Sequence, residues 1–148
     1  MRFTTGHVIS APVERVWAAL IDVESWPEWT ASVRRVQRLD DGPFQVGSTA
    51  RIEQPRLRPA VWRVTLLTPP DQAHPEAPAR FDWVSRAGGV TTVAGHLLVP
   101  SGNGRVRVEH SIDQAGPLAP LVALLGGSLI RRYVQTEADG LKAHCERG

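Results

Sequence analysis

Several residue types are scarce in this 148-residue sequence, and each scarcity excludes a class of protein. Cys145 is the single cysteine, so the chain cannot form an intrachain disulfide. The first residues lack the apolar core of a signal peptide. The longest apolar run, residues 118–125, is too short to span a bilayer and contains Pro120. We therefore expect one cytoplasmic domain over residues 1–148, without stable membrane insertion.

Lysine is also scarce, because every basic residue except Lys142 is an arginine. Arginine does not deprotonate, so the isoelectric point is near 9.3 although the formal net charge is only +2. The basic residues are scattered among acids, and no block of five or six like charges occurs. We therefore expect no nucleic-acid partner, and we interpret the pairs Arg34-Arg35 and Arg131-Arg132 as solvated surface.

The common catalytic and cofactor motifs are absent. The sequence has no GxSxG elbow, no glycine-rich phosphate loop after a strand, no HExxH and no zinc-type spacing of cysteine and histidine. Covalent catalysis and nucleotide chemistry are therefore poorly supported, and we expect no cofactor. Cys145 has no helix N-terminus or basic partner that would activate it, so we expect it to pack as a small apolar residue.

The C-terminal stretch, from Pro117 to about Arg147, is the only segment long enough for a helix of several turns. Its first part is apolar on nearly every side, and Gly126-Gly127 then predicts a bend or a helix start. Such a helix is either a core helix with a flexible joint or a helix that shifts over a cavity to admit a ligand. The second part is amphipathic, with apolar residues at spacings of four, four, three and four: Ile130, Val134, Ala138, Leu141 and Cys145.

The N-terminal part predicts a strand followed by two helices. Residues 2–10 alternate in polarity as a strand does. Ser25 and Glu28 have the spacing of a capping box, so a short second helix should carry Trp26 and Trp29. The first helix follows Pro12, because apolar residues then recur at i, i+3, i+4, i+7 and i+8: Val13, Val16, Trp17, Leu20 and Ile21.

Between these helices and the C-terminal one, turn residues separate six further predicted strands, at 33–39, 48–54, 60–68, 79–87, 90–99 and 104–113. Short connections indicate an antiparallel meander. Such a sheet buries one face, and the C-terminal helix is the only segment long enough to cover it. The predicted inner face carries Ala50, Ile52, Trp62, Val64, Leu66, Phe81, Trp83, Ser85, Val90, Ala94, His96, Leu98, Val106, Val108, His110 and Ile112. In strand 90–99 it is ambiguous which side chains point inward, because Val93, Leu97 and Val99 form a second apolar set on the opposite face.

Several short motifs along the chain form a recognisable set: Ile9-Ser10-Ala11-Pro12-Val13-Glu14-Arg15-Val16-Trp17, Asp22, Trp26-Pro27-Glu28-Trp29, Phe81-Asp82-Trp83, Gly104, Gly116-Pro117-Leu118 and Leu141-Lys142. With these residues the chain resembles the polyketide cyclase/dehydrase group of the START-like superfamily, also called Bet v 1-like or helix-grip. The resemblance runs over essentially the whole chain and implies an α+β fold: a seven-stranded antiparallel sheet around a long C-terminal helix, two short helices after the first strand, and an internal cavity for a hydrophobic small molecule. Members of this group bind lipids, sterols, plant hormones or quinones, or cyclise polyketides.

The candidate ligand-binding residues are mainly aromatic. Trp62, Phe81 and Trp83 share the predicted inner face, where their rings either line a pocket and stack on an aromatic ligand or fill the core. Trp29 either packs the short helix on the sheet or borders the cavity mouth. The other candidates lie on the last two strands and the C-terminal helix: His96, His110, Leu125, Leu129 and Tyr133.

The candidate catalytic residues are His96, His110, Tyr133 and Arg51. A buried imidazole can move a proton near neutral pH, although each histidine can equally be satisfied by backbone. The Tyr133 hydroxyl either anchors a ligand or lies in solvent. Arg51 either polarises a carbonyl or forms an exposed pair with Glu53. We expect no metal, because no carboxylate is predicted beside the histidines on the same face.

These observations favour a protein that binds an apolar, ring-containing small molecule, lipid or polyketide-like, between the sheet and the C-terminal helix. The alternative is an enzyme of polyketide cyclase or dehydratase type, acting by general acid and base chemistry in the same cavity. A third interpretation, an interaction module that uses the Arg131-Arg132 surface, is supported by charge alone. The sequence leaves open the ligand's identity and the choice between monomer and homodimer.

Overall fold

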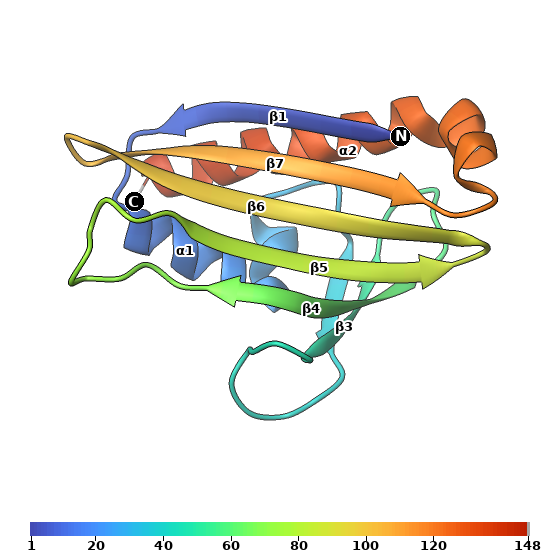
Figure 1. Cartoon of the computed structure of the whole chain (residues 1–148), viewed down its shortest axis with the longest axis horizontal. Coiled ribbons are helices and arrows are strands. Elements are labelled where there is room, and N and C mark those ends of the chain that lie inside the picture. Colours follow the sequence, from blue (N-terminus) through green and yellow to red (C-terminus); the bar gives the residue numbers. More distant parts are fainter. Residues whose placement is uncertain (148) are drawn as a thin grey trace.

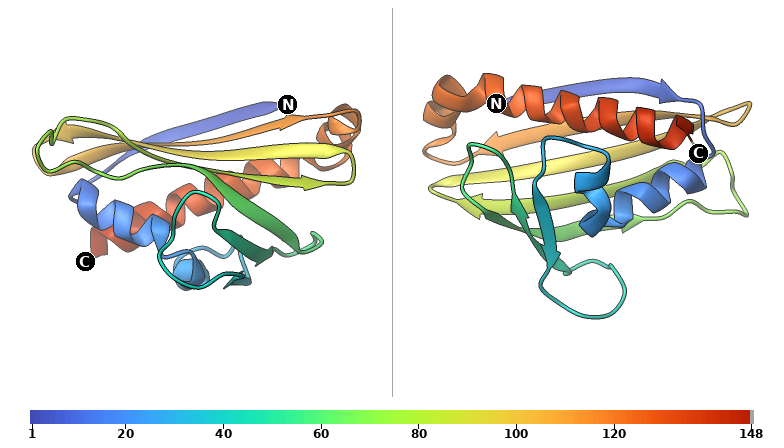
Figure 2. Two further views of the ribbon diagram at one scale, coloured as in Figure 1. Left: turned by 60° about the horizontal axis from the view of Figure 1, so that its bottom comes forward. Right: turned by 180° about the vertical axis from the view of Figure 1, so that it is seen from behind.

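The computed structural model describes residues 1–147 and has the α+β architecture expected from the sequence. A sheet forms one layer, and the helices lie on one of its faces (Figure 1; Figure 2, right). The strands are β1 (Arg2–Ile9), β2 (Arg35–Arg38), β3 (Thr49–Glu53), β4 (Ala60–Thr68), β5 (Ala79–Ala87), β6 (Val90–Gly102) and β7 (Arg105–Ala115). The helices are α1 (Val13–Ile21), the 3-10 helix η1 (Val23–Glu28) and α2 (Ala119–Arg147).

The seven strands form one antiparallel sheet in the order β1-β7-β6-β5-β4-β3-β2. The predicted meander is thus confirmed, and β1 closes it by pairing with β7. Figure 2 shows that β3 and β2 curl away from the plane of the longer strands, toward the helices. The sheet therefore wraps around α2, as the helix-grip fold requires.

Helix α1 begins after Pro12, whose fixed φ suits a helix start, and buries Val16, Trp17 and Leu20 as its apolar spacing predicts. The predicted capping box at Ser25 does not form. The short helix starts earlier, at Val23, and the Ser25 hydroxyl donates instead to the Asp22 carboxylate at 2.7 Å. Trp26 is buried within η1 and Trp29 ends it, so this short helix does carry both indoles.

Helix α2 carries the amphipathic stripe that the sequence predicts. Its C-terminal part, Ala138, Leu141 and Cys145, is buried, and Ile130 and Val134 are half-buried. It runs without interruption through Gly126-Gly127, so the helix does not start there. Figure 1 shows the first turns, in orange, set at an angle to the red remainder. The leucines of these first turns are largely in solvent: Leu118, Leu121, Leu124 and Leu125 are 46, 50, 82 and 78% exposed.

The inner face matches the predicted one on β5, β6 and β7, where Phe81, Trp83, His96 and His110 are all buried. The prediction is wrong at Leu66, which is on the solvent side. A β-bulge between Val64 and Leu66 shifts the pairing with β5 by one residue, so Leu67 takes the inner place. A one-residue shift turns every following side chain to the other face.

None of the helices within residues 1–147 is both long enough and apolar enough to cross a lipid bilayer.

The close approach of α2 to the loop after η1 gives a stability prediction. A Cβ atom at Gly140 would collide with the carbonyl oxygen of Trp29, whereas one at Gly126, in the same helix, would meet no neighbouring atom. Urea denaturation of Gly140→Ala should show a loss of about 1–3 kcal/mol in the free energy of unfolding. Gly126→Ala, the matched control, should gain up to about 1 kcal/mol from helix propensity. Equal shifts in the two variants would contradict the packing at Gly140.

Candidate functional site

Two adjoining cavities lie between the sheet and α2. The smaller, of about 80 Å³, is walled by aromatic, histidine and α2 side chains. The larger, of about 470 Å³, continues toward the end of the sheet where β5 meets β6. Five residues border both cavities: Gln54, Leu57, Trp62, Ile112 and Ile130. The larger volume is within the range of small-molecule sites, roughly 300–1,000 Å³.

Two histidines and a carboxylate meet on the wall of the smaller cavity. His96 and His110 are direct partners across β6 and β7, and their ring centroids are 5.2 Å apart. Glu137 reaches them from α2: its Oε2 lies 3.1 Å from Nε2 of His96 and 3.2 Å from Nε2 of His110. Both imidazoles are 2% exposed. The cluster therefore brings three ionisable groups together, with the two histidines buried and the Glu137 side chain 16% exposed.

The ring of His96 is held firmly. Its Nδ1 lies 2.9 Å from the carbonyl oxygen of Phe81, and its face stacks on the Phe81 ring at 4.9 Å. A carbonyl oxygen only accepts, so Nδ1 must carry the hydrogen. Nε2 is thereby aimed at Glu137.

His110 has an incomplete set of partners. Its Nε2 is close to Glu137, but the arrangement departs from the angles that a hydrogen bond needs, and neither ring nitrogen has a hydrogen-bond partner among residues 1–147. A buried polar atom without a partner costs about 1–3 kcal/mol. Burial lowers the pKa of His110, despite the opposing effect of Glu137, so the ring is neutral at pH 7.

Glu137 is ionised in spite of its burial. Burial alone would raise its pKa, but the neighbouring imidazoles of His110 and His96 outweigh that effect and lower the pKa to about 2. The site thus holds a carboxylate under an apolar sheet, hydrogen-bonded to Nε2 of His96 at 3.1 Å and 3.2 Å from Nε2 of His110.

The structure brings five of the predicted site residues to the smaller cavity: Trp62, Trp83, His96, His110 and Tyr133. Phe81 is fully buried behind His96 and borders neither cavity, because its ring fills the space between His96, Phe44 and Trp83. Trp62 has a buried indole Nε1 without a hydrogen-bond acceptor within residues 1–147.

Four predicted site residues lie away from the cavities. Trp29 is buried against Trp26 and His144. Leu125 points into solvent and Leu129 is half-buried, because the α2 face that meets the cavity passes through Ile130 instead. Arg51 lies between Ala50 and Ile52, which point inward, so its side chain points outward, 3.9 Å from Glu53. Arg51 therefore cannot polarise a bound carbonyl.

Two polar groups under the sheet already have backbone partners. The Tyr133 hydroxyl donates to the carbonyl oxygen of Pro55, which ties α2 to the loop between β3 and β4. His7 Nε2 lies 2.9 Å from the carbonyl oxygen of Ala138, and His7 borders neither cavity. Tyr133 borders the smaller cavity, but its hydroxyl must give up its bond to Pro55 before it can meet a ligand.

The residue that sequence reasoning missed is Glu137. Its spacing held the signal, because it follows Ile130 by seven residues and Val134 by three, on the same helical face. A charged residue within an apolar stripe of a helix indicates that a polar partner lies on the element against which the helix packs. The cavities are also lined by residues that the sequence did not suggest as ligand-binding, among them Trp26, Gln54, Gln114 and Val122.

Residues 1–146 match the family described as polyketide cyclase / dehydrase and lipid transport. The chain belongs to this family. No curated protein matches the sequence.

Solved structures agree with this family's fold. A hypothetical protein of Helicobacter pylori, jhp0584, has a TM-score of 0.82 at 17% identity, over 98% of this chain and 88% of its own. The di-domain ARO/CYC protein StfQ of the steffimycin biosynthetic pathway has a TM-score of 0.71 at 13% identity, over 98% of this chain and 44% of its own. Norcoclaurine synthase from Thalictrum flavum, solved with dopamine and hydroxybenzaldehyde, has a TM-score of 0.69 at 13% identity, over 97% of this chain and 84% of its own. At these identities the likeness shows the fold alone.

Cys145 gives a prediction about reactivity. Its side chain is buried, and burial raises the pKa of the thiol to about 11, so the reactive thiolate is scarce near neutral pH. The native protein should therefore react with a colorimetric disulfide reagent at pH 8 far more slowly than the protein unfolded in guanidinium. Equal rates in the two states would show that the C-terminal end of α2 is not packed as described.

Proposed function

We propose that the protein binds a hydrophobic, ring-containing small molecule in the larger cavity, with part of the ligand reaching the smaller one. The single observation that carries this proposal is the cavity of about 470 Å³, which is lined mainly by apolar side chains. Membership of a family described by cyclase, dehydrase and lipid transport activity agrees with such a ligand. So do the two aromatic compounds held by the norcoclaurine synthase structure.

Two polar atoms on the cavity walls favour a ligand with oxygen functions. Trp62 borders both cavities, and its buried Nε1–H has no acceptor in the described part of the chain. Gln114 borders the larger cavity, and its buried Oε1 has no donor there either. A carbonyl or ether oxygen would accept from Trp62, and a hydroxyl would donate to Gln114. A purely hydrocarbon ligand would leave both atoms unsatisfied.

The experiment is a titration with 1-naphthol, a bicyclic aromatic probe with one hydroxyl group, followed by quenching of tryptophan fluorescence. Ile130 borders both cavities, so Ile130→Trp should fill the space and weaken binding by roughly 10-fold or more, since each 1.4 kcal/mol of lost contact is tenfold. The matched control is Leu124→Trp, on the solvent side of the same helix, which should bind as the parent does.

Two outcomes would contradict the proposal. One is a parent protein that neither binds 1-naphthol nor retains any apolar compound detectable by mass spectrometry after gentle purification. The other is equal binding by the parent and the Ile130→Trp variant.

A catalytic function of cyclase or dehydratase type is the second candidate, and the convergence of His96, His110 and Glu137 at the cavity wall favours it. Such an enzyme would remove a proton from the carbon beside a ketone and pass it to one of these side chains. Exchange of that hydrogen for deuterium in a small β-keto thioester, followed by NMR in D2O, measures this step directly.

The parent protein should then exchange this hydrogen faster than buffer alone, and His110→Ala should slow the protein-catalysed rate by roughly 100-fold or more. His144→Ala is the control, because His144 stacks on Trp29 and borders neither cavity. A loss of exchange in His110→Ala with 1-naphthol affinity retained would separate catalysis from binding. An exchange rate no higher than that of buffer would contradict the catalytic candidate and leave the binding proposal intact.

A further inference from the structure

The meeting point of His96, His110 and Glu137 has the donor atoms of a metal site. One ligand atom from each of the three side chains lies within 4.8 Å of the other two. We propose that these residues bind one divalent cation of the zinc type on the wall of the smaller cavity. The sequence argued against a metal because no carboxylate is predicted beside the histidines, but Glu137 supplies one from α2.

The distances are close to those that a metal imposes. Zinc binds imidazole nitrogen and carboxylate oxygen at roughly 2.0–2.2 Å, which in a tetrahedral site places neighbouring ligand atoms roughly 3.3 Å apart. Oε2 of Glu137 is 3.1 Å from Nε2 of His96 and 3.2 Å from Nε2 of His110. A small movement of the two rings toward each other would complete a three-ligand face.

The surroundings of His96 fit a ligand role. A metal-binding histidine normally donates its other ring N–H to a carboxylate or a backbone carbonyl, which fixes the tautomer and the ring orientation. His96 donates from Nδ1 to the carbonyl oxygen of Phe81 at 2.9 Å, and its ring is also stacked on the Phe81 side chain. With Nδ1 donating to the backbone, Nε2 is the ring nitrogen that a cation can bind in place of a proton, and Nε2 is the atom that faces Glu137.

The surroundings of His110 are a second observation that points to a bound cation, and it does not depend on the distances within the cluster. The His110 side chain is 2% exposed, it borders the smaller cavity, and neither ring nitrogen has a hydrogen-bond partner among residues 1–147. A hydrogen-bonded network of the three side chains explains the position of His96 but leaves His110 unpaired. A cation between the three donor atoms uses the lone pair at Nε2 of His110 and neutralises the Glu137 carboxylate.

The composition of the site favours zinc, cobalt or a similar ion over calcium or magnesium, since imidazole suits transition metals and the latter two prefer oxygen ligands. Two histidines and one glutamate are three protein ligands, a number that leaves a coordination position for water or a ligand oxygen. That position would face the cavity, whose wall also includes Trp62 and Tyr133.

The test is a titration of chelator-treated full-length protein with Co²⁺ as a visible probe, followed by displacement with Zn²⁺. We expect one cobalt per chain, with the strong visible absorption of a four- or five-coordinate site, and loss of that absorption when one equivalent of zinc is added. Absorption typical of six-coordinate cobalt in water, or the lack of one-to-one binding, would overturn the proposal.

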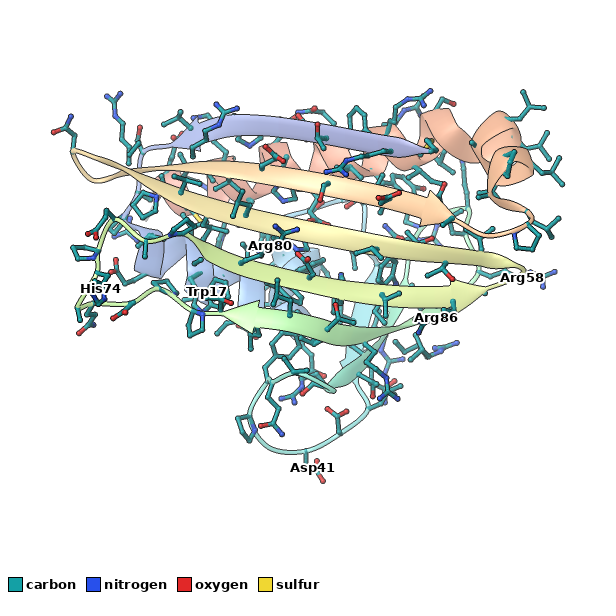
Figure 3. The ribbon with its side chains drawn as sticks, in the orientation of Figure 1. Trp17, Asp41, Arg58, His74, Arg80 and Arg86 are labelled. Carbon is teal, nitrogen blue, oxygen red and sulfur yellow. The ribbon has the colours of Figure 1, made fainter. Side chains whose placement is uncertain are left out.

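Variants locate the site. His96→Ala, His110→Ala and Glu137→Gln each remove a ligand, so each should raise the cobalt Kd by more than the roughly 10–100-fold typical of an outer-shell partner. His74→Ala and His144→Ala are the matched controls and should bind cobalt as the parent does. His74, labelled in Figure 3, lies in the exposed loop between β4 and β5 beside Asp71 and does not border the smaller cavity. Unchanged affinity in the three ligand variants, or an equal loss in the controls, would show that cobalt binds elsewhere and overturn the assignment.

Glu137→Gln keeps the shape of the side chain, so it decides the question even where an alanine variant fails to fold, as judged by circular dichroism. The proposal is independent of the binding of an apolar ligand, because Trp62 and Ile130 contribute no metal-binding atom. It does bear on the catalytic candidate, since an imidazole that binds a cation cannot also accept a proton at the same nitrogen.

Discussion

The structure depends on how the Glu137 carboxylate is compensated beneath the sheet. A buried charge without partners is strongly unfavourable, and removal of one partner of a buried pair is costly. Glu137 is on α2, whereas His96 and His110 are on two neighbouring strands of the sheet, β6 and β7. This contact therefore fixes both the rotation and the position of α2 along the sheet. The same constraint sets where the cavities lie, because the helix side chains that wall them, such as Ile130, belong to that face.

Most of the fold could be predicted from the sequence, because the hydrophobic periodicity is strong in several elements. The stripe of α1, the turns between strands and the alternation in β7 each follow directly from residue spacing. The errors occur where local pattern and tertiary packing differ. The bulge after Val64 moves Leu66 outward, and the start of η1 is set by Asp22 rather than by Ser25.

The candidate site was only half predictable for the same reason. Parity along β6 and β7 places His96 and His110 on the inner face, and that prediction is confirmed. Glu137 reaches them from an element far away in sequence, so no local spacing joins it to either histidine. Leu125 shows the converse: apolar character suggested burial, but the direction of α2 turns this residue to the solvent. Helix rotation is a tertiary property, and only the packed structure supplies it.

The exposed leucines at the beginning of α2 affect how different parts of the helix open. Little apolar area is removed from water there, so these turns contribute far less to the hydrophobic stabilisation than the segment around Leu141. The free-energy cost of local opening is lower where a segment buries less apolar area. Segments with few buried contacts therefore exchange their amide hydrogens at the lowest free-energy cost. Val122, in these turns, borders the larger cavity. The least firmly held part of the longest helix is therefore also a wall of the larger of the two cavities, and fraying of that segment would widen this cavity without disturbing the core.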